Sequence, residues 1–375
     1  MRRTIVDVYA LHTVPPSNLN RDDTGSPKTA VYGGVRRARV SSQAWKRAIR
    51  LAFADLLDRS QLGERTKRVG ESLAARIRDL APELSAEDAS ALAARAFAAS
   101  GLAAKADKKK GAAKDAESSY LLFLSHRQLD NIAAAALAAE RAGTVLDKTQ
   151  FKKLANTEHS VDIAMFGRML ADMTDLNVDA ACQVAHAISV HAVDNEFDYF
   201  TAVDDRKADA DEAGAGMIGT VEFNSSTLYR YATVDVDALH QTLGDPAATR
   251  AAVEAFLTAF ARAMPTGKQN TFAHRTLPDA LLARVRDTQP INLVGAFETP
   301  VRESHAAGRV QLAAARLAEH TAAVESAYGE RPVGSWVTQV GEQTAVLADL
   351  GKAVTFAELV TGVGEQVTAA LGQPA

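Results

Sequence analysis

Apolar residues recur along the chain in two periods, one typical of strands and the other typical of helices. Strand-like runs, rich in Val, Ile, Leu and aromatic residues, cover residues 4–13, 181–193, 197–203, 217–236, 281–285 and 291–297. Helix-like stripes, with apolar residues three or four positions apart, begin at residues 43 and 160 and cover residues 64–79, 86–99, 118–142, 147–153, 247–264, 304–328 and 356–371. Strands and helices therefore share one chain without strict alternation, which predicts an α+β fold.

The predicted elements divide the chain into two regions. Residues 51–158 are rich in alanine and helical, which predicts an insertion. Residues 1–50 and 159–375 follow the order β-α-β-β-α-β, the ferredoxin-like order used by RNA-recognition modules. Within this second region the polar residues 204–216 separate two strand-like runs and cannot bury themselves. We therefore expect a β-hairpin arm that protrudes at about 194–222.

Basic residues gather near the start of the chain, although the net charge is −4. Between Arg21 and Arg50 eight Lys or Arg residues stand against Asp22 and Asp23. Binding to nucleic acid depends on where charge lies rather than on its total. This stretch is therefore a candidate phosphate-binding surface.

The second half of the basic stretch predicts a helix that begins beside an anion site. Ser41 or Ser42 is a suitable N-cap, and Trp45 begins an apolar stripe. Lys46 and Arg50 stand one turn apart off that stripe, and a helix N-terminus stabilises phosphate. Gly33 and Gly34 permit a tight turn that lets backbone approach a ligand. An amphipathic helix with a solvated basic face fits the same residues.

Several long motifs resemble one known family. They are NRDD at 20–23, the GG-x-RR-x-R run at 33–39, SSQAWKRAIR at 41–50, VDIAMFGRM at 161–169, FDYFTAVDD at 197–205 and GKQNTFAHRTLPD at 267–279. Together they resemble the Cascade backbone subunit of type I-E CRISPR systems, the CasC branch of the Cas-seven superfamily. The resemblance covers essentially the whole chain.

The resemblance implies a hand-shaped modified RNA-recognition fold with a palm, helical fingers at 51–158 and a thumb formed by the arm. It further implies that copies polymerise along a guide RNA (crRNA) beside other Cascade subunits in antiviral defence. The thumb displaces a base at intervals, and the other bases remain available for pairing with target DNA. The protein is then a binding subunit rather than an enzyme, and no cofactor is expected.

Residue by residue, the resemblance implies roles for two sets of residues in this chain. The RNA-facing residues would be Arg21, Lys28, Ser41, Gln43, Lys46, Arg50, Arg168, Met169, Lys268 and Gln269. The thumb residues would be Phe197, Tyr199, Phe200, Thr201 and Phe223. The acidic thumb segment suits a basic surface on a neighbouring copy of the protein.

A lysine-rich segment lies within the predicted insertion, at residues 103–115. A flexible solvated loop explains its composition. The functional alternative is salt-dependent contact with the target-DNA backbone. The candidates for that contact are Lys105, Lys108, Lys109 and Lys110.

Two other function classes remain open. A metal-dependent ribonuclease of a related CRISPR effector would use Asp22 and Asp23, since paired carboxylates hold Mg²⁺. A helical metabolic enzyme with a phosphate pocket is the other, although no Walker, GxGxxG, GxSxG or HExxH motif occurs. His186 and His191 are expected on opposite faces of a strand, and Cys182 is the only cysteine, so no metal site is predicted. No membrane-spanning run or signal peptide is apparent, and we expect a cytoplasmic protein.

Overall fold

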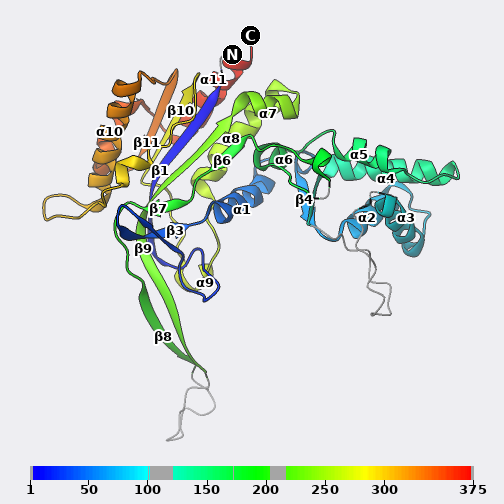
Figure 1. Ribbon diagram of the computed structural model, residues 1–375, viewed down its shortest axis with the longest axis horizontal. Helices are drawn as coiled ribbons and strands as arrows, with labels where there is room; N and C mark the ends of the chain where they lie inside the picture. The colour runs from blue at the N-terminus through cyan, green and yellow to red at the C-terminus, as the bar shows by residue number, and fades with distance from the viewer. Residues whose placement is uncertain (1–2, 100, 102–120, 172, 203–216, 373–375) are drawn as a thin grey trace, which may run out of the picture. The chain divides into compact units, whose positions relative to one another are not determined.

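The computed structural model describes residues 3–99, 101, 121–171, 173–202 and 217–372. Two compact units are present (Figure 1). The first comprises Met1–Ala52, Gln183–Asp237 and Val253–Ala375, and the second comprises Phe53–Cys182 and Ala238–Ala252. The second unit begins near the start predicted for the insertion at 51–158, and it continues past the predicted end to Cys182.

A mixed sheet forms the centre of the first unit, and ten strands of the described residues belong to it. Along the sheet the order is β12 (Lys352–Ala353), β11 (Gly334–Gln339), β10 (Ala280–Arg286), β1 (Ile5–Ser17), β9 (Met217–Asp235), β7 (Ala187–Ser189), β3 (Val35–Val40) and β2 (Thr29–Tyr32). Strands β6 (Cys182–Val184) and β8 (Glu196–Ala202) also pair with β9. The predicted α+β class is confirmed.

Strand β1 lies in the middle of this sheet and pairs antiparallel with both β10 and β9. It continues through Pro15 and Pro16 to Ser17, with a register shift between Val14 and Ser17. Proline cannot donate a ladder hydrogen bond, so an irregularity in the pairing is where a strand tolerates it. The irregularity explains why the strand extends past residue 13.

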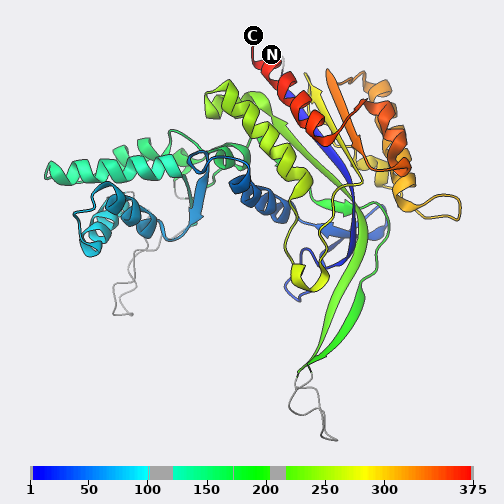
Figure 2. The ribbon, with the colours of Figure 1, turned by 180° about the vertical axis from the view of Figure 1, so that it is seen from behind.

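Helices cover both faces of the sheet (Figures 1 and 2). Helix α10 (Arg309–Tyr328) packs on the face that carries Tyr9 and Leu11 of β1. Trp45 of α1 (Ser42–Ala52) packs on the opposite face with Val14. Alternate side chains of β1 therefore enter two different cores, which explains its nearly continuous apolar sequence.

Further helices of the first unit complete this covering. They are the start of α7 (Val236–Leu243), the second half of α8 (Pro246–Arg262), the short α9 (Gln269–Phe272) and α11 (Phe356–Leu371). Helix α11 lies directly on α8 and on β11. Gly364 faces Glu254 of α8, and Gly362 faces the indole ring of Trp336 of β11. A Cβ atom at Gly362 would lie 2.5 Å from the indole nitrogen of Trp336, so this glycine allows the close approach of α11 to β11.

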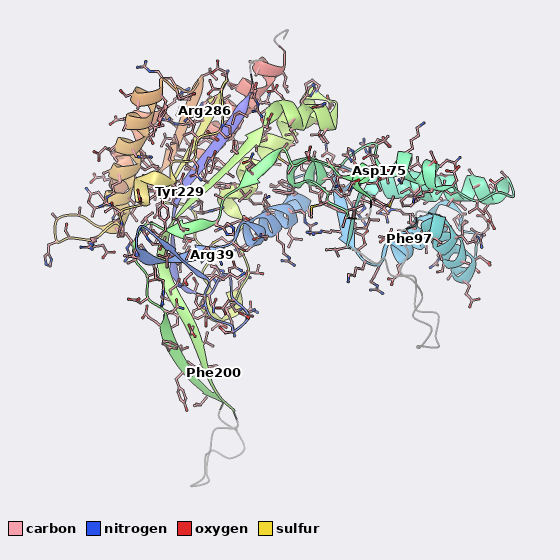
Figure 3. All side chains as sticks on the ribbon, viewed as in Figure 1. Arg39, Phe97, Asp175, Phe200, Tyr229 and Arg286 are labelled. Atoms are coloured by element: carbon pink, nitrogen blue, oxygen red, sulfur yellow. The ribbon has the colours of Figure 1, made fainter. Side chains whose placement is uncertain are left out.

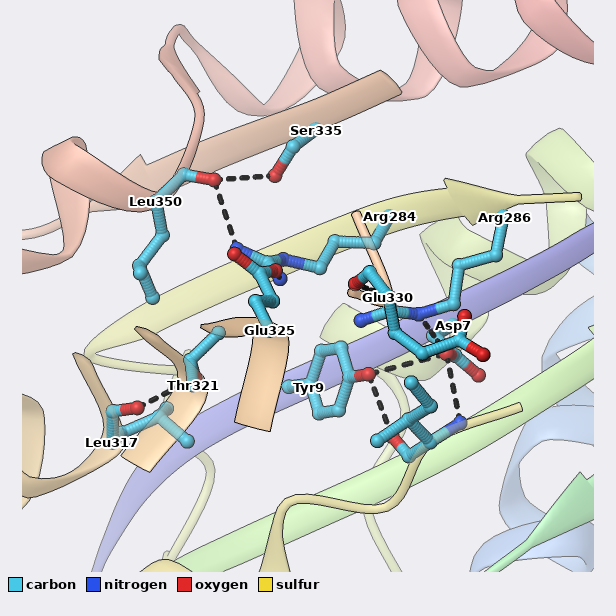
Figure 4. A network of polar contacts seen from close by, with 11 residues as sticks. Asp7, Tyr9, Arg284, Arg286, Leu317, Thr321, Glu325, Glu330, Ser335 and Leu350 are labelled. Atoms are coloured by element: carbon cyan, nitrogen blue, oxygen red, sulfur yellow. Dashed lines mark hydrogen bonds and ion pairs between the residues drawn. The ribbon is translucent and has the colours of Figure 1, made fainter. Parts of the chain in front are cut away.

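A buried polar network lies between the sheet and α10 (Figure 4). The carboxylate of Asp7 forms an ion pair with Arg286, with 3.0 Å between Oδ2 and Nε. It also accepts hydrogen bonds from the hydroxyls of Tyr231, at 2.8 Å, and Tyr9, at 3.2 Å. The backbone N–H of Ile291 donates a further bond to the same carboxylate. The network satisfies a charge that would otherwise be costly to bury.

The second unit is a helical subdomain with a two-stranded sheet. Its helices are α2 (Val69–Leu80), α3 (Ala86–Ala99), α4 (His126–Arg141), α5 (Lys148–Ala155) and α6 (Val161–Phe166), and its strands are β4 (Gly63–Thr66) and β5 (Leu122–Ser125). The core contains Leu73, Phe97, Ile132 and Phe151. Residues 64–66 and 122–124, which had been predicted as helical, pair instead with each other as strands.

Other predicted elements also differ from the structure in extent or type. The run at 181–193 contains only the short strands β6 and β7, and the helix expected over 304–328 begins at Arg309. The helix expected from residue 160 ends at Phe166, because Gly167 has a φ of +76° and lies against the carbonyl of Val178. Residues 291–297, predicted as a strand, contain a 3₁₀ turn at Val294–Phe297 instead. The side chain of Asn292 starts this turn by accepting the N–H of Val294. In the part of the chain that the structure describes, no helix is long and apolar enough to cross a membrane.

Candidate nucleic-acid interface

The loop at residues 20–28 is fixed beside the start of α1. The side-chain oxygen of Asn20 accepts the backbone N–H of Ser41 at 2.9 Å, and its carbonyl accepts the N–H of Lys28. Ser41 is the N-cap predicted from the sequence, because its hydroxyl accepts the N–H of Ala44 at 3.3 Å. Ser41 is buried and already engaged in this cap, so it shapes the helix N-terminus from within the protein.

Helix α1 presents the predicted basic face. Trp45 and Ile49 are buried, while Lys46 and Arg50 are partly exposed one turn apart and Gln43 is exposed. The apolar stripe is therefore confirmed as the buried side. The helix ends at Ala52, earlier than the stripe suggested.

A buried arginine holds α1 on the sheet. The guanidinium of Arg230 in β9 lies between two rings, 3.7 Å from the centroid of Trp45 and 4.3 Å from that of Phe260. It also contacts Nδ1 of His12 at 2.9 Å. Burial lowers the pKa of Arg230 to about 9, so the guanidinium remains charged at neutral pH. This stacking fixes the position of the basic face of α1 on the sheet.

The arginine-rich run before α1 is a β-hairpin, β2–β3, which sequence analysis missed. Its arginines have different roles: Arg36 is exposed, whereas Arg37 is buried and donates to four backbone carbonyls. The tight turn at Gly33 and Gly34 has positive φ at both residues, as expected. A Cβ at Gly33 would lie 1.6 Å from the carbonyl oxygen of Glu298. The close approach is therefore to the protein's own backbone, where a ligand had been expected.

A basic cluster, which the sequence did not predict, is formed by Lys28, Arg39 and His186. Nη1 of Arg39 lies 3.2 Å from Nδ1 of His186, and its Nε donates to the carbonyl of Thr29. Partial burial, followed by the charges of Arg39 and Lys28, lowers the pKa of His186. The sequence offered Lys28 as a candidate RNA contact, Arg39 as the last residue of an arginine-rich run and His186 within a strand-like run, but nothing in it indicated that the three lie together.

The loop after α8 brings further polar residues to the loop at 20–28. Gly267 lies so close to the backbone carbonyls of Asn18 and Leu19 that a Cβ would be 2.6 Å and 2.4 Å from their oxygens. Together with residues 19–25, Gly267 lines an open hollow. The neighbouring Lys268, in a left-handed conformation, and Gln269 are thereby placed near Arg21, which is exposed.

Arg168 and Met169, which were both predicted to face RNA, lie in different environments in the structure. Arg168 is buried in the second unit, and its guanidinium donates to the carbonyls of Leu176, Phe123 and Ala155. An RNA-facing role had been expected for it, but the side chain instead joins three segments of the protein. Met169 is 87% exposed, in agreement with the expected surface position.

The predicted thumb is a hairpin of β8 and the first part of β9 (Figure 1). Phe197 and Tyr199 lie two residues apart on one face of β8 and are 68% and 62% exposed. Phe200 faces the other way, over Gly219 of β9, and is 36% exposed (Figure 3). Thr201 is exposed, and Phe223 contacts Phe272 at the base of the hairpin. The thumb therefore carries an unpaired aromatic face.

The candidate metal ligands Asp22 and Asp23 both lie in the loop at 20–28. Asp22 Oδ1 accepts the hydroxyl and N–H of Thr24 and the N–H of Ser26, and these bonds lower the pKa of Asp22. Across the described ranges, no three His, Cys, Asp or Glu side chains are grouped to hold a metal ion. The proposed DNA contacts Lys105, Lys108, Lys109 and Lys110 lie outside the described residues, as does the thumb tip at 203–216.

The fold and this surface together define an α+β protein with a basic loop, a basic helix and an aromatic arm. The sequence matches the family described as CT1975-like protein over residues 6–362, and the chain belongs to that family. Comparison with curated proteins finds no match.

Two solved structures are similar over nearly the whole chain. One is a chain of a "CRISPR RNA-guided surveillance complex, pre-nicking", with 33% identity, a TM-score of 0.83 and coverage of 97% of this chain and 100% of that one. The other is a chain of a "CRISPR RNA-guided surveillance complex", with 29% identity, a TM-score of 0.75 and coverage of 96% and 99%.

Proposed function

We propose that this protein is the guide-RNA-binding backbone subunit of a Cascade-type CRISPR surveillance complex of type I-E. The observation that carries the proposal is the end-to-end match to a chain of an RNA-guided surveillance complex at 33% identity. The basic face of α1 and the loop at 20–28 supply a suitable surface for an RNA backbone. Copies would assemble along the guide beside other subunits in the cytoplasm and leave its bases free to pair with target DNA.

The strand order supports an RNA-recognition type of palm. The four strands β10, β1, β9 and β7 are neighbours in that order. Helix α1 follows β1 in the chain, and α8 connects β9 to β10. This order supports the ferredoxin-like arrangement proposed for the palm, which would be extended by β11 and β12 on one side and by β3 and β2 on the other.

Assembly along RNA is the direct test of the proposed function. The full chain would be co-expressed with guide RNAs of increasing length and analysed by native mass spectrometry. We expect a discrete RNA in the purified particle and a copy number that rises in steps with RNA length. A particle without RNA, or a copy number independent of RNA length, would contradict the proposal.

Loss of the exposed thumb aromatics is expected to change the contacts with RNA and to leave folding unchanged. Replacing Phe197 and Tyr199 with Ala should leave the stability of the monomer within about 0.5 kcal/mol, because both side chains are exposed. The regular pattern of accessible positions in a ribonuclease footprint should be lost, because base stacking on aromatic rings is removed. Tyr328→Ala provides a matched control, since Tyr328 is also exposed and lies on α10. An unchanged footprint in the thumb variant would count against the role of the arm.

We further propose that the protein does not cleave RNA. Bound RNA should remain intact with Mg²⁺ or Mn²⁺, because Asp22 is engaged by its own loop and no three His, Cys, Asp or Glu side chains of the described residues are grouped to hold a metal ion. Denaturing gels of end-labelled RNA provide the measurement. Metal-dependent cuts that disappear in Asp22→Ala or Asp23→Ala would establish the ribonuclease alternative instead.

A further inference from the structure

Lys28, Arg39 and His186 come together from three separate segments of the first unit. Lys28 precedes β2, Arg39 lies in β3, and His186 lies between β6 and β7. The backbone N–H of Arg39 donates to the carbonyl of Lys28 at 2.9 Å, and the guanidinium of Arg39 contacts the imidazole of His186 at 3.2 Å. Lys28 and Arg39 also line one small cleft together with Asn20, Asn224 and Ser226.

No acidic side chain offsets this cluster. The charged groups that act on His186 are Arg39 from β3 and Lys28 from the preceding loop, and both are cations. Among the described residues, no Asp or Glu forms an ion pair with either of them. The neutral imidazole of an exposed histidine held against two cations accepts from Arg39 through Nδ1. When an anion arrives, Nδ1 takes up a proton and exchanges its contact with Arg39 for one with the anion.

We infer that Lys28, Arg39 and His186 form a binding site for one backbone phosphate of the RNA, which His186 contacts as the protonated imidazolium. The inference rests on the proposed function and adds two residues, Arg39 and His186, to the RNA surface. It gives binding a specific signature, because each RNA phosphate bound at this site brings one proton onto the protein.

The direction of the pH effect follows from the charges. In the free protein, partial burial, followed by the charges of Arg39 and Lys28, holds the pKa of His186 below its usual value, so the imidazole is neutral at pH 7. A bound phosphate adds a negative charge beside the ring and raises the same pKa. Between the free and bound pKa values the complex holds one more proton, so RNA affinity rises as pH falls. A full proton corresponds to about tenfold in Kd per pH unit.

The experiment measures Kd against pH by fluorescence anisotropy, with the full chain, a fluorescein-labelled single-stranded RNA and constant ionic strength. For the wild-type protein we expect Kd to fall by about 3- to 10-fold between about pH 8 and about pH 6. His186→Gln should bind weakly with little pH dependence in this range. His186→Lys carries a permanent charge and should bind tightly across the whole range. His305→Gln is the matched control, because His305 is also exposed and lies outside the cluster.

Calorimetry gives an independent readout of the proton. Titrations in two buffers of different ionisation enthalpy should show proton uptake for the wild type and none for His186→Lys. Equal pH slopes in the wild type, His186→Gln and His186→Lys would overturn the inference while leaving RNA binding intact. A complete failure of every form to bind RNA would instead contradict the proposed function. Thermal melts of each variant distinguish a lost contact from a lost fold.

Discussion

Replacement of Asp7 by Ala is expected to destabilise the first unit by about 3–5 kcal/mol. Asp7 is fully buried and pairs with Arg286, which is also buried. Removing the carboxylate leaves the guanidinium charged in the interior, and the hydroxyl of Tyr231 loses its acceptor. Urea unfolding followed by tryptophan fluorescence reports this change, since Trp45 and Trp336 both lie in the first unit.

A second substitution separates loss of the pair from loss of a side chain. Asp7→Ala combined with Arg286→Met removes both charges, and it should recover part of the lost stability because no unpaired charge remains. Gln311→Ala is a neutral reference at an exposed position of α10. A loss below about 1 kcal/mol for Asp7→Ala would show that the buried charge is compensated in another way.

Charge reversal on α1 is expected to have the largest effect on RNA binding. Replacing Lys46 and Arg50 with Glu removes two cations from one helix face and places two anions there. With about 1 kcal/mol for each phosphate-paired cation, the loss of attraction alone raises Kd about 30-fold, and repulsion adds to it. We therefore expect no assembly on RNA in electrophoretic shifts at moderate salt.

The helix itself should survive this change. Neither residue belongs to the buried pair Trp45 and Ile49, so far-ultraviolet circular dichroism should remain that of the wild type. A variant with Lys148 and Lys153 of α5 replaced by Glu carries the same change in net charge elsewhere, and both residues are exposed. Equal loss of binding in the two double variants would mean that total charge decides affinity, and that α1 is not a specific site.

Sequence patterns predicted the elements whose periodicity is set by local burial. The stripe beginning at Trp45 was visible because one side of α1 faces the sheet, and the hairpin of β8 and β9 was visible because a polar segment divides two aromatic runs. The hairpin of β2 and β3 was missed because its arginines resemble a loop. Its pairing depends on contact between β3 and β7, which is remote in sequence.

Site residues were harder to predict because their roles depend on contacts from distant segments. Arg168 looks like a surface cation in sequence, yet carbonyls of Phe123, Ala155 and Leu176 surround its guanidinium. Arg37 differs from its neighbour Arg36 in the same way. Arginine is rarely buried, so no periodic pattern distinguishes a structural arginine from one that faces a ligand.

The length of β9 has a mechanical consequence for the thumb. One continuous strand, Met217–Asp235, pairs with β8 in its first part and with β1 in the remainder. Movement of the thumb against the palm must therefore bend a hydrogen-bonded strand, because on this side no loop is available as a hinge. Displacement of the arm by a neighbouring molecule would consequently place strain on the central strands of the sheet.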